Sequence, residues 1–185
     1  MNKYVRAAVC AATGLLKTSV LKLGKGSAFN GGFIALISPL TEITVDRGGK
    51  LSWGKLIKIR SGSKIRVRKG AICKIGDNFS MSNNCVLTAH ESIVIGNGVQ
   101  FGPGVLVYDH DHDFRASGGL AAKKYKTTPI EIGNNVWIGA NSIILRGTKI
   151  GDNCVVGAGT IVKGNFLDNS LICQNRETKI SQIKK

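Results

Sequence analysis

Residues 132–161 read IGNNVW-IGANSI-ILRGTK-IGDNCV-VGAGTI, five consecutive blocks of six residues with no insertion or deletion. A period of six is neither the 3.6-residue repeat of a helix nor the two-residue alternation of an ordinary strand. It fits a chain in which each block supplies one short strand and one corner. Gly, Asn and Asp fill many of the second to fourth positions, and they suit corners because they tolerate left-handed backbone angles.

The remaining positions of the block predict the core. Each block opens with an aliphatic residue that we expect to point inward, and its fifth residue is small or β-branched and fills the space beside it. Stacked coils would bury both as continuous ladders, which one block alone cannot do. The ladders comprise Ile132, Ile138, Ile144, Ile150, Val156 and Val162, and Val136, Ser142, Thr148, Cys154 and Thr160. The sequence therefore predicts an all-β fold, a parallel β-helix of hexapeptide repeats.

The repeat brackets one interruption. The same register occurs in residues 75–92 and, after a shift of two residues, in 95–106. Between Leu106 and Thr128 the repeat stops and the polar stretch DHDHDFRASGGLAAKKYKTT takes its place. Because loops on a rigid scaffold often carry function, we expect an extended catalytic loop at 107–128.

The register also suggests how the chain is organised. We assign residues 1–25 to a short N-terminal helical or irregular segment, 26–180 to the β-helix domain and 181–185 to a basic tail. The register is faint before Ile57, so we expect early coils or a capping segment in residues 26–56.

Composition limits the class of protein. A chain of 185 residues suffices for one cored domain. The five cysteines are scattered and form no C-x-x-C pair, so we expect neither a disulfide framework nor a zinc knuckle, and we interpret them as reduced thiols of a cytoplasmic protein. Residues 1–74 hold 15 Lys and Arg against two acidic residues, and such a block attracts polyanions. Aromatic residues are only 6% and no nucleic-acid motif occurs, so we expect no nucleic-acid partner.

The N-terminal segment 1–25 combines basic residues with an apolar run. The run Ala7–Leu16 is too short to span a bilayer. Its apolar residues continue at helical spacing, and lysines follow them. This pattern predicts an amphipathic helix, either lying on an anionic membrane surface at the inner face of the membrane or packed as a cap on the body.

The chain resembles the hexapeptide-repeat acyltransferases, which include galactoside, maltose and nodulation-factor acetyltransferases and enzymes that O-acetylate bacterial polysaccharides. The resemblance covers roughly residues 57–180, and its most specific part is PIEIGNNVWIGANSIILRGTKIGDNCVVGAGTIV at 129–162. It implies a left-handed coil and a homotrimer with active sites at the subunit interfaces. It also implies transfer of an acetyl group from acetyl-CoA to a hydroxyl of a saccharide, such as a cell-surface polysaccharide or its precursor, with a histidine as general base and no metal. Neither the hand nor the trimer follows from the period itself.

The resemblance also indicates which histidine is the base. A count along the sequence from Pro103, with the spacing found in the family, lands on His112, but the tandem D-H-D-H also leaves His110 as the base or as a residue that orients the substrate. A nearby carboxylate would raise the histidine pKa and fix its tautomer, and Asp109 is in addition a candidate for substrate binding. His90 occupies a corner of the repeat, where we expect a surface residue.

Further site residues follow from the same family. Asn83 and Asn84 are candidates to contact the acceptor sugar, and Trp137 to wall the substrate pocket. For coenzyme A, the resemblance implies a backbone N–H near the thioester and backbone contacts along the pantetheine arm. These involve Gly139, Ala140, Gly157 and Ala158, with Lys163, Arg176 or Lys179 near the phosphates. After Val162 the chain departs from the family pattern, which leaves the phosphate-binding cation open.

Two other classes compete with this interpretation. The γ-type carbonic anhydrases share the fold and bind zinc through three histidines, and three histidines are present here. His110 and His112 are closer in sequence than the zinc ligands of that family. A non-catalytic β-helix that binds polymers would need no histidine at all.

Overall fold

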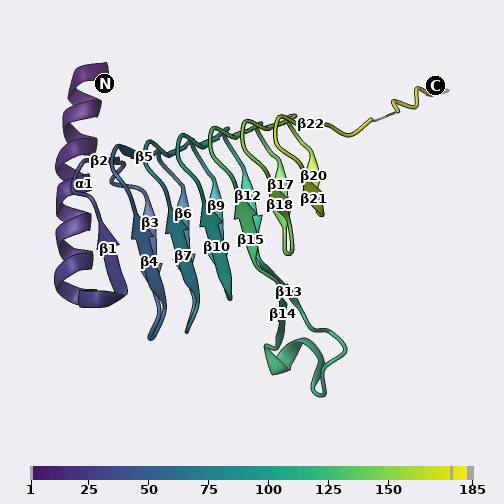
Figure 1. The fold of residues 1–185 in the computed structure, drawn as a ribbon, viewed down its shortest axis with the longest axis horizontal. Coiled ribbons are helices and arrows are strands. Elements are labelled where there is room, and N and C mark those ends of the chain that lie inside the picture. Colours follow the sequence, from purple (N-terminus) through teal and green to yellow (C-terminus); the bar gives the residue numbers. More distant parts are fainter. Residues whose placement is uncertain (1, 176, 183–185) are drawn as a thin grey trace.

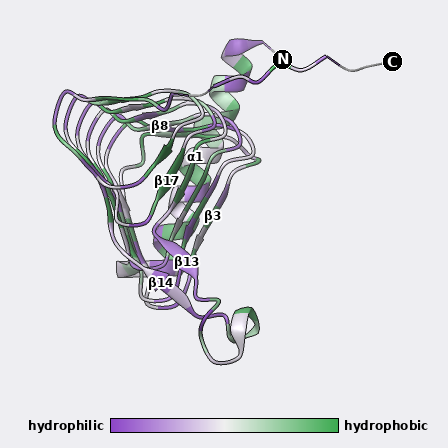
Figure 2. Ribbon diagram, turned by 90° about the vertical axis from the view of Figure 1, so that its right-hand side faces the viewer, coloured by the Kyte–Doolittle hydropathy of each residue, from purple (hydrophilic) through white to green (hydrophobic). Residues whose placement is uncertain are grey.

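The computed structural model describes residues 2–175 and 177–182 and shows a left-handed parallel β-helix capped by one helix (Figure 1). Arg176 and the last three residues of the basic tail lie outside the described residues. Figure 2 looks along the coil and shows its triangular cross-section, with a hairpin projecting from one corner. The predicted fold class is confirmed.

Three parallel sheets form the walls of the triangle. The first sheet contains β1 (Phe29–Gly31), β4 (Lys50–Trp53), β7 (Ile72–Ile75), β10 (Ser92–Ile95), β15 (Ile130–Ile132), β18 (Lys149–Ile150) and β21 (Asn165–Phe166). The second contains β2 (Ala35–Ile37), β5 (Ile57–Ile59), β8 (Ser80–Met81), β11 (Gln100–Phe101), β16 (Trp137–Ile138), β19 (Val155–Val156) and β22 (Leu171–Ile172). The third contains β3 (Glu42–Val45), β6 (Lys64–Val67), β9 (Val86–Ala89), β12 (Leu106–Tyr108), β17 (Ile143–Leu145) and β20 (Ile161–Val162).

Each coil turns at three edges. In the coil that contains β15, β16 and β17, residues 133–136 form the first edge, 139–142 the second edge and 146–148 the third edge. The equivalent residues of the other coils stack above and below them, so each edge runs the length of the molecule.

The core is built as the repeat predicts. Every residue of the two expected ladders is buried, with at most 3% of its surface exposed. Ile132 pairs with Ile150 of the next coil, and Ile138 pairs with Val156. At the corners, Asn135 and Asn141 adopt left-handed φ angles of 54° and 57°. The hexad thus determines both which residues face inward and where the chain turns.

The early coils explain why the register is faint before Ile57. Phe29 pairs with Leu51 and Leu51 with Cys73, an offset of 22 residues per coil. Ile132 pairs with Ile150, an offset of 18, which is three blocks of six. The wider early coils contain four-residue strands such as β4, so they stack in the same fold without a six-residue period.

Helix α1 (Lys3–Lys25) lies across the first coil and closes that end of the core (Figure 1). Asn2 caps it by accepting a hydrogen bond from the Tyr4 N–H at 3.0 Å. The helix can approach β2 closely because residue 14 is glycine: a Cβ there would lie 1.9 Å from the carbonyl oxygen of Ala35. Thr18 and Leu21 are buried on the same face.

Thr18 gives a stability prediction. Its hydroxyl is fully buried and has no hydrogen-bond partner among the described residues. Because an unpaired buried hydroxyl costs free energy, we expect Thr18→Val to raise the free energy of unfolding by about 1 kcal/mol. Thermal denaturation measures this as a Tm increase of roughly 2–4 °C for a chain of this size. A lower Tm would mean that the hydroxyl has a partner in solution.

Candidate active site at the third edge

The interruption of the repeat is a hairpin that leaves the third edge after β12. Strand β13 (His110–His112) pairs antiparallel with β14 (Tyr125–Thr127), and the 3-10 turn η2 (Gly119–Ala122) lies between them. The Thr128 N–H donates to the carbonyl oxygen of Asp109 at 3.0 Å, which closes the base of the hairpin. The first residues of the hairpin are therefore fixed on the rigid scaffold.

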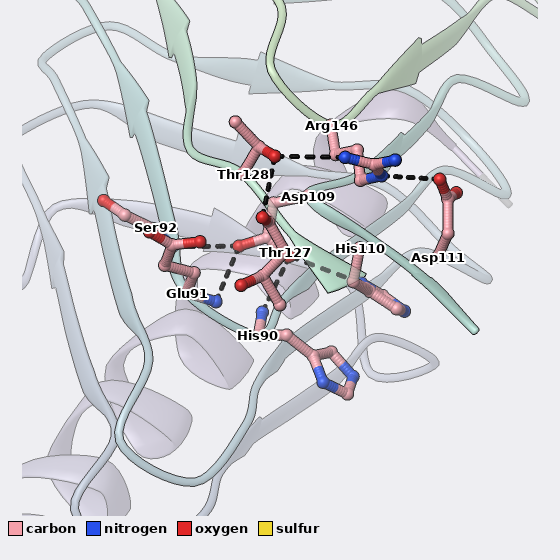
Figure 3. Close-up of polar contacts among 9 residues, drawn as sticks. All are labelled: His90, Glu91, Ser92, Asp109, His110, Asp111, Thr127, Thr128 and Arg146. Atoms are coloured by element: carbon pink, nitrogen blue, oxygen red, sulfur yellow. Dashed lines mark hydrogen bonds and ion pairs between the residues drawn. The ribbon is translucent and has the colours of Figure 1, made fainter. Parts of the chain in front are cut away.

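Asp109 is the anchor of this base (Figure 3). Its side chain is fully buried and accepts the backbone N–H groups of His90 at 2.8 Å, Glu91 at 2.8 Å and Ser92 at 2.9 Å. One oxygen also lies 3.3 Å from Nδ1 of His110. Both oxygens of Asp109 are engaged by the protein and none of its surface is exposed, so the structure gives Asp109 contacts with the chain in place of the expected contact with substrate.

His110 lies in a partly enclosed aromatic cluster. Its ring centroid is 3.8 Å from that of His90 and 5.4 Å from that of Tyr125. Only 13% of its side chain is exposed. When Nδ1 carries the proton it donates to Asp109, and Nε2 is then left with a free lone pair. This is the arrangement that a histidine general base requires.

His90 is partly buried, although its position at a corner of the repeat predicted a surface residue. Burial, followed by the nearby charge of His110, lowers its pKa from 6.5 to about 4. His90 is therefore neutral at physiological pH and packs against His110 without adding a positive charge beside it. No pattern in the sequence predicted this contact, because residues 90 and 110 belong to different coils.

His112 is in a different environment. Its ring contacts Tyr125 at 4.7 Å and is exposed, and no side chain or backbone group in the described chain hydrogen-bonds to it. Of the two histidines that the sequence left open, His110 thus has the carboxylate partner, although the count from Pro103 favours His112.

Asp111 and Asp113, the other two acidic residues of the D-H-D-H-D motif, form ion pairs that stabilise the hairpin. Asp111 pairs with Arg146 at 2.5 Å, and Arg146 also donates to the Thr128 hydroxyl at 3.2 Å (Figure 3). Asp113 pairs with Lys126 across the hairpin at 3.3 Å. Arg146 was not among the expected site residues. Its place on the third edge could not be read from the block ILRGTK, because the block does not show which edge its third residue occupies.

The expected substrate-contacting residues lie elsewhere. Trp137 is 56% exposed on the second sheet, where it lines a cavity with Gln100 and Asn135. Asn83 and Asn84 lie on the second edge, and Asn84 adopts a left-handed φ of 59°. Within one chain, the structure does not bring these three residues to the histidine cluster.

The second edge presents a row of open backbone donors. The N–H of Gly139 donates to Val156 and that of Gly157 to Ile172, so these two glycines cannot supply the expected donor to a ligand. In contrast, the N–H groups of Ala140 and Ala158 have no acceptor within residues 2–175 and 177–182.

The first edge shows why these alanines matter. At the equivalent position of the block it carries Asn134 and Asp152, whose side chains accept the N–H groups of Asn97 and Asn134 at 2.9 and 2.6 Å. Alanine has no such acceptor, so the second edge keeps its donors free. Ala140 and Ala158 therefore remain candidates to hydrogen-bond a ligand.

Of the candidate phosphate-binding cations, Lys163 and Lys179 have no ion pair within the described part of the chain, and Arg176 lies outside it. Lys163 is exposed on the third edge, one coil beyond Arg146, and Lys179 is exposed in the segment after β22. Residues 2–175 and 177–182 contain no group of three His, Cys, Asp or Glu side chains that could hold a metal ion. The three histidines meet through stacked rings around Tyr125, not through converging nitrogen atoms.

Comparison with known proteins agrees with this architecture. A family model described as the hexapeptide repeat of succinyl-transferase matches residues 129–163. Galactoside O-acetyltransferase of Escherichia coli K12 is 37% identical over 104 residues, covering 54% of this chain and 49% of that protein. These matches support the hexapeptide-repeat acyltransferase family for this chain.

Other relatives match more of the chain. The putative lipopolysaccharide biosynthesis O-acetyl transferase WbbJ of Escherichia coli K12 is 26% identical over 149 residues, covering 71% of this chain and 76% of that protein. AntD, an N-acyltransferase from Bacillus cereus solved with dTDP and 3-hydroxybutyryl-CoA, is 26% identical, with a TM-score of 0.64 over 80% of this chain and 79% of that one. This hexapeptide-repeat chain spans about half the length of several curated relatives that it matches.

Proposed function

We propose that this protein transfers an acetyl group from acetyl-CoA to a hydroxyl of a saccharide, with His110 as the general base. The observation that carries the proposal is the Asp109–His110 pair, held at the base of the hairpin with Nδ1 directed at a buried carboxylate. The likeness to galactoside O-acetyltransferase, WbbJ and AntD supports the reaction class.

The chemistry of each step follows from this pair. Nε2 of His110 takes the proton of the acceptor hydroxyl while the oxygen forms a bond to the thioester carbonyl carbon. The C–S bond then breaks, and the imidazolium returns its proton to the departing sulfur of coenzyme A. Asp109 keeps the imidazole in the required tautomer and stabilises its charged form. No metal is needed for any of these steps.

Acetyl-CoA fits the second edge. Ala140 and Ala158 offer open N–H donors on adjacent coils. Such preorganised donors suit the amides of the pantetheine arm and the oxyanion that forms during transfer. Lys163 and Lys179 are exposed cations that would meet the phosphates.

Proline substitution tests the role of these donors. Pro103 occupies the same block position two coils before Ala158, so the backbone at this edge accepts proline. We therefore expect Ala158→Pro to leave Tm unchanged and to raise the KM for acetyl-CoA about tenfold, since one hydrogen bond of about 1.4 kcal/mol is lost. Steady-state kinetics measure the effect, with Ala158→Ser as the matched control that keeps the N–H. An unchanged KM would show that coenzyme A binds elsewhere.

We further propose that the working unit is a homotrimer with shared active sites. The base lies on the third edge and the open donors on the second, so a complete site needs the third edge of one subunit against the second edge of another. Light scattering gives the mass. At an acetyl-CoA concentration well below KM, His110→Ala and Ala158→Pro should each turn over slowly. If activity is regained when these two variants are refolded together, the site is shared between chains. No regain would place both functions in one chain.

The primary assay measures free thiol released from acetyl-CoA with a panel of saccharides. The panel includes lipid-linked and nucleotide-linked sugars, and a nucleotide-linked amino sugar tests amine acceptors, since AntD is an N-acyltransferase. If no acceptor supports thiol release and zinc copurifies, the zinc enzyme is the better interpretation. If neither occurs, a non-catalytic binding module is favoured.

We propose that the protein is located in the cytoplasm, at the inner face of the membrane. All five cysteines are free thiols, and Cys73, Cys85 and Cys154 are buried without partners for a disulfide. This use of cysteine is typical of a reducing compartment. A polysaccharide precursor carried on the membrane would meet the enzyme there.

A further inference from the structure

The outward face of α1 is apolar. Only Gly14, Thr18 and Leu21 of its 23 residues are buried against the coil. The opposite side carries residues at the i, i+3, i+4 and i+7 spacing of one helix face. These are Val5, Ala8, Val9, Ala12, Leu16, Ser19, Val20 and Leu23, with no charged residue among them. A helix at the surface of a soluble protein normally has the reverse arrangement.

This face is strongly exposed. Leu16 is 64% exposed, Val20 59% and Leu23 88%, and neighbouring Leu15 and Val5 are each more than half exposed. A contiguous apolar surface of this kind marks a contact with another molecule or a membrane.

Positive charge surrounds the face. Residues 1–41 contain no Asp or Glu. Arg6, Lys17 and Lys22 flank the apolar side of the helix. The Lys17 ammonium donates to the carbonyl oxygens of Pro39 and Thr41, and Lys22 lies over the ring of Phe33 at 3.8 Å. Beside the N-terminal half of the helix, a cavity of about 410 Å³ opens against the second sheet. Its wall contains Lys3, Arg6, Lys58 and Arg60.

We propose that α1 docks this protein on an anionic lipid bilayer, with its outward face in the interface and the surrounding cations on the head groups. A second copy of the same face would bring two rings of positive charge together, whereas anionic lipid neutralises them. Helix α1 is also long and apolar enough to cross a membrane by length and composition. The close contact of Gly14 with Ala35 and the cation Lys17 at mid-helix favour the surface position.

The orientation has a consequence for the substrate, which rests on the proposed function. Since α1 lies flat across the first coil, the axis of the coil stands upright on the bilayer (Figure 1). Strand spacing and the width of the helix then put the base of the hairpin roughly 25 Å above the lipid. A saccharide attached to a lipid carrier would reach His110 at that height.

Vesicle cosedimentation of the full chain tests the docking. We expect wild-type protein to bind vesicles of equimolar phosphatidylcholine and phosphatidylglycerol, to bind pure phosphatidylcholine poorly, and to be released by high salt. Leu16→Glu/Leu23→Glu should weaken binding to the anionic vesicles by about tenfold or more. Leu167→Glu is the matched control, because Leu167 is 84% exposed at the far end of the coil and should have no effect.

Three results would overturn the proposal. They are no binding to anionic vesicles, binding that Leu16→Glu/Leu23→Glu does not change, and binding that resists alkaline carbonate, as a membrane-crossing helix would. If the wild-type protein forms a larger assembly and Leu16→Glu/Leu23→Glu dissociates it, the apolar face instead binds a second copy of the chain. Thiol release with a water-soluble saccharide should be unaffected by the double variant. Failure of docking is therefore distinguishable from failure of the proposed enzyme.

Discussion

His110→Ala is expected to lower kcat for thiol release by about 10²-fold to 10⁴-fold, the usual contribution of a general base. The reason is that Nε2 of His110 is the nitrogen left free by the hydrogen bond from Nδ1 to Asp109. KM for acetyl-CoA should change little, because the substitution leaves the open N–H donors of the second edge, which are proposed to hold the coenzyme, unchanged. Steady-state kinetics with a saturating acceptor measure both quantities.

His112→Ala is the matched control for this prediction. Its ring is exposed and contacts Tyr125 but no carboxylate, so we expect a change of less than about fivefold in kcat. The reverse result, with activity lost in His112→Ala and retained in His110→Ala, would mean that the count from Pro103 identifies the base and that the hairpin rearranges around substrate.

Asp109→Ala is expected to be the most destabilising single change near the site. Its carboxylate accepts three backbone N–H groups from residues 90–92 of the preceding coil, and all of them would lose their acceptor in a partly buried position. We expect the free energy of unfolding to fall by about 3 kcal/mol or more. Urea denaturation measures this loss, and catalysis should fall with it because His110 loses its orienting partner.

Asp113→Ala separates this effect from the general loss of an acidic residue. Asp113 is partly exposed and pairs with Lys126 across the hairpin. A surface ion pair contributes about 0–1 kcal/mol, so this variant should remain close to wild type in stability. Equal effects of the two substitutions would show that Asp109 is not the anchor of the third edge.

The hexads determined the fold because the residues of each block specify one strand and one corner. Ile138 faces inward and Asn141 turns left-handed for reasons that lie within six residues of chain. The interruption was equally local: a polar stretch that breaks the period must leave the body, and it does so after Tyr108. The early coils could not be predicted in this way, because their offset of 22 residues per coil is not a multiple of six and leaves no six-residue period in the sequence.

The tertiary structure alone decided how the site is assembled. Asp109 meets residues 90–92, and His110 meets His90 and Tyr125, across coils and across the hairpin. The sequence named the histidines of the loop, and the family spacing favoured His112. The preference for His110 depends on which ring lies beside a buried carboxylate, and only the tertiary structure shows that. The sequence also left open which face of α1 packs on the coil. A helical pattern shows which residues share a face, but only the structure shows that the face containing Gly14 contacts the coil and that the apolar face points outward. Local periodicity specifies a repeat, whereas contacts between residues about 20 positions apart depend on how the coils stack.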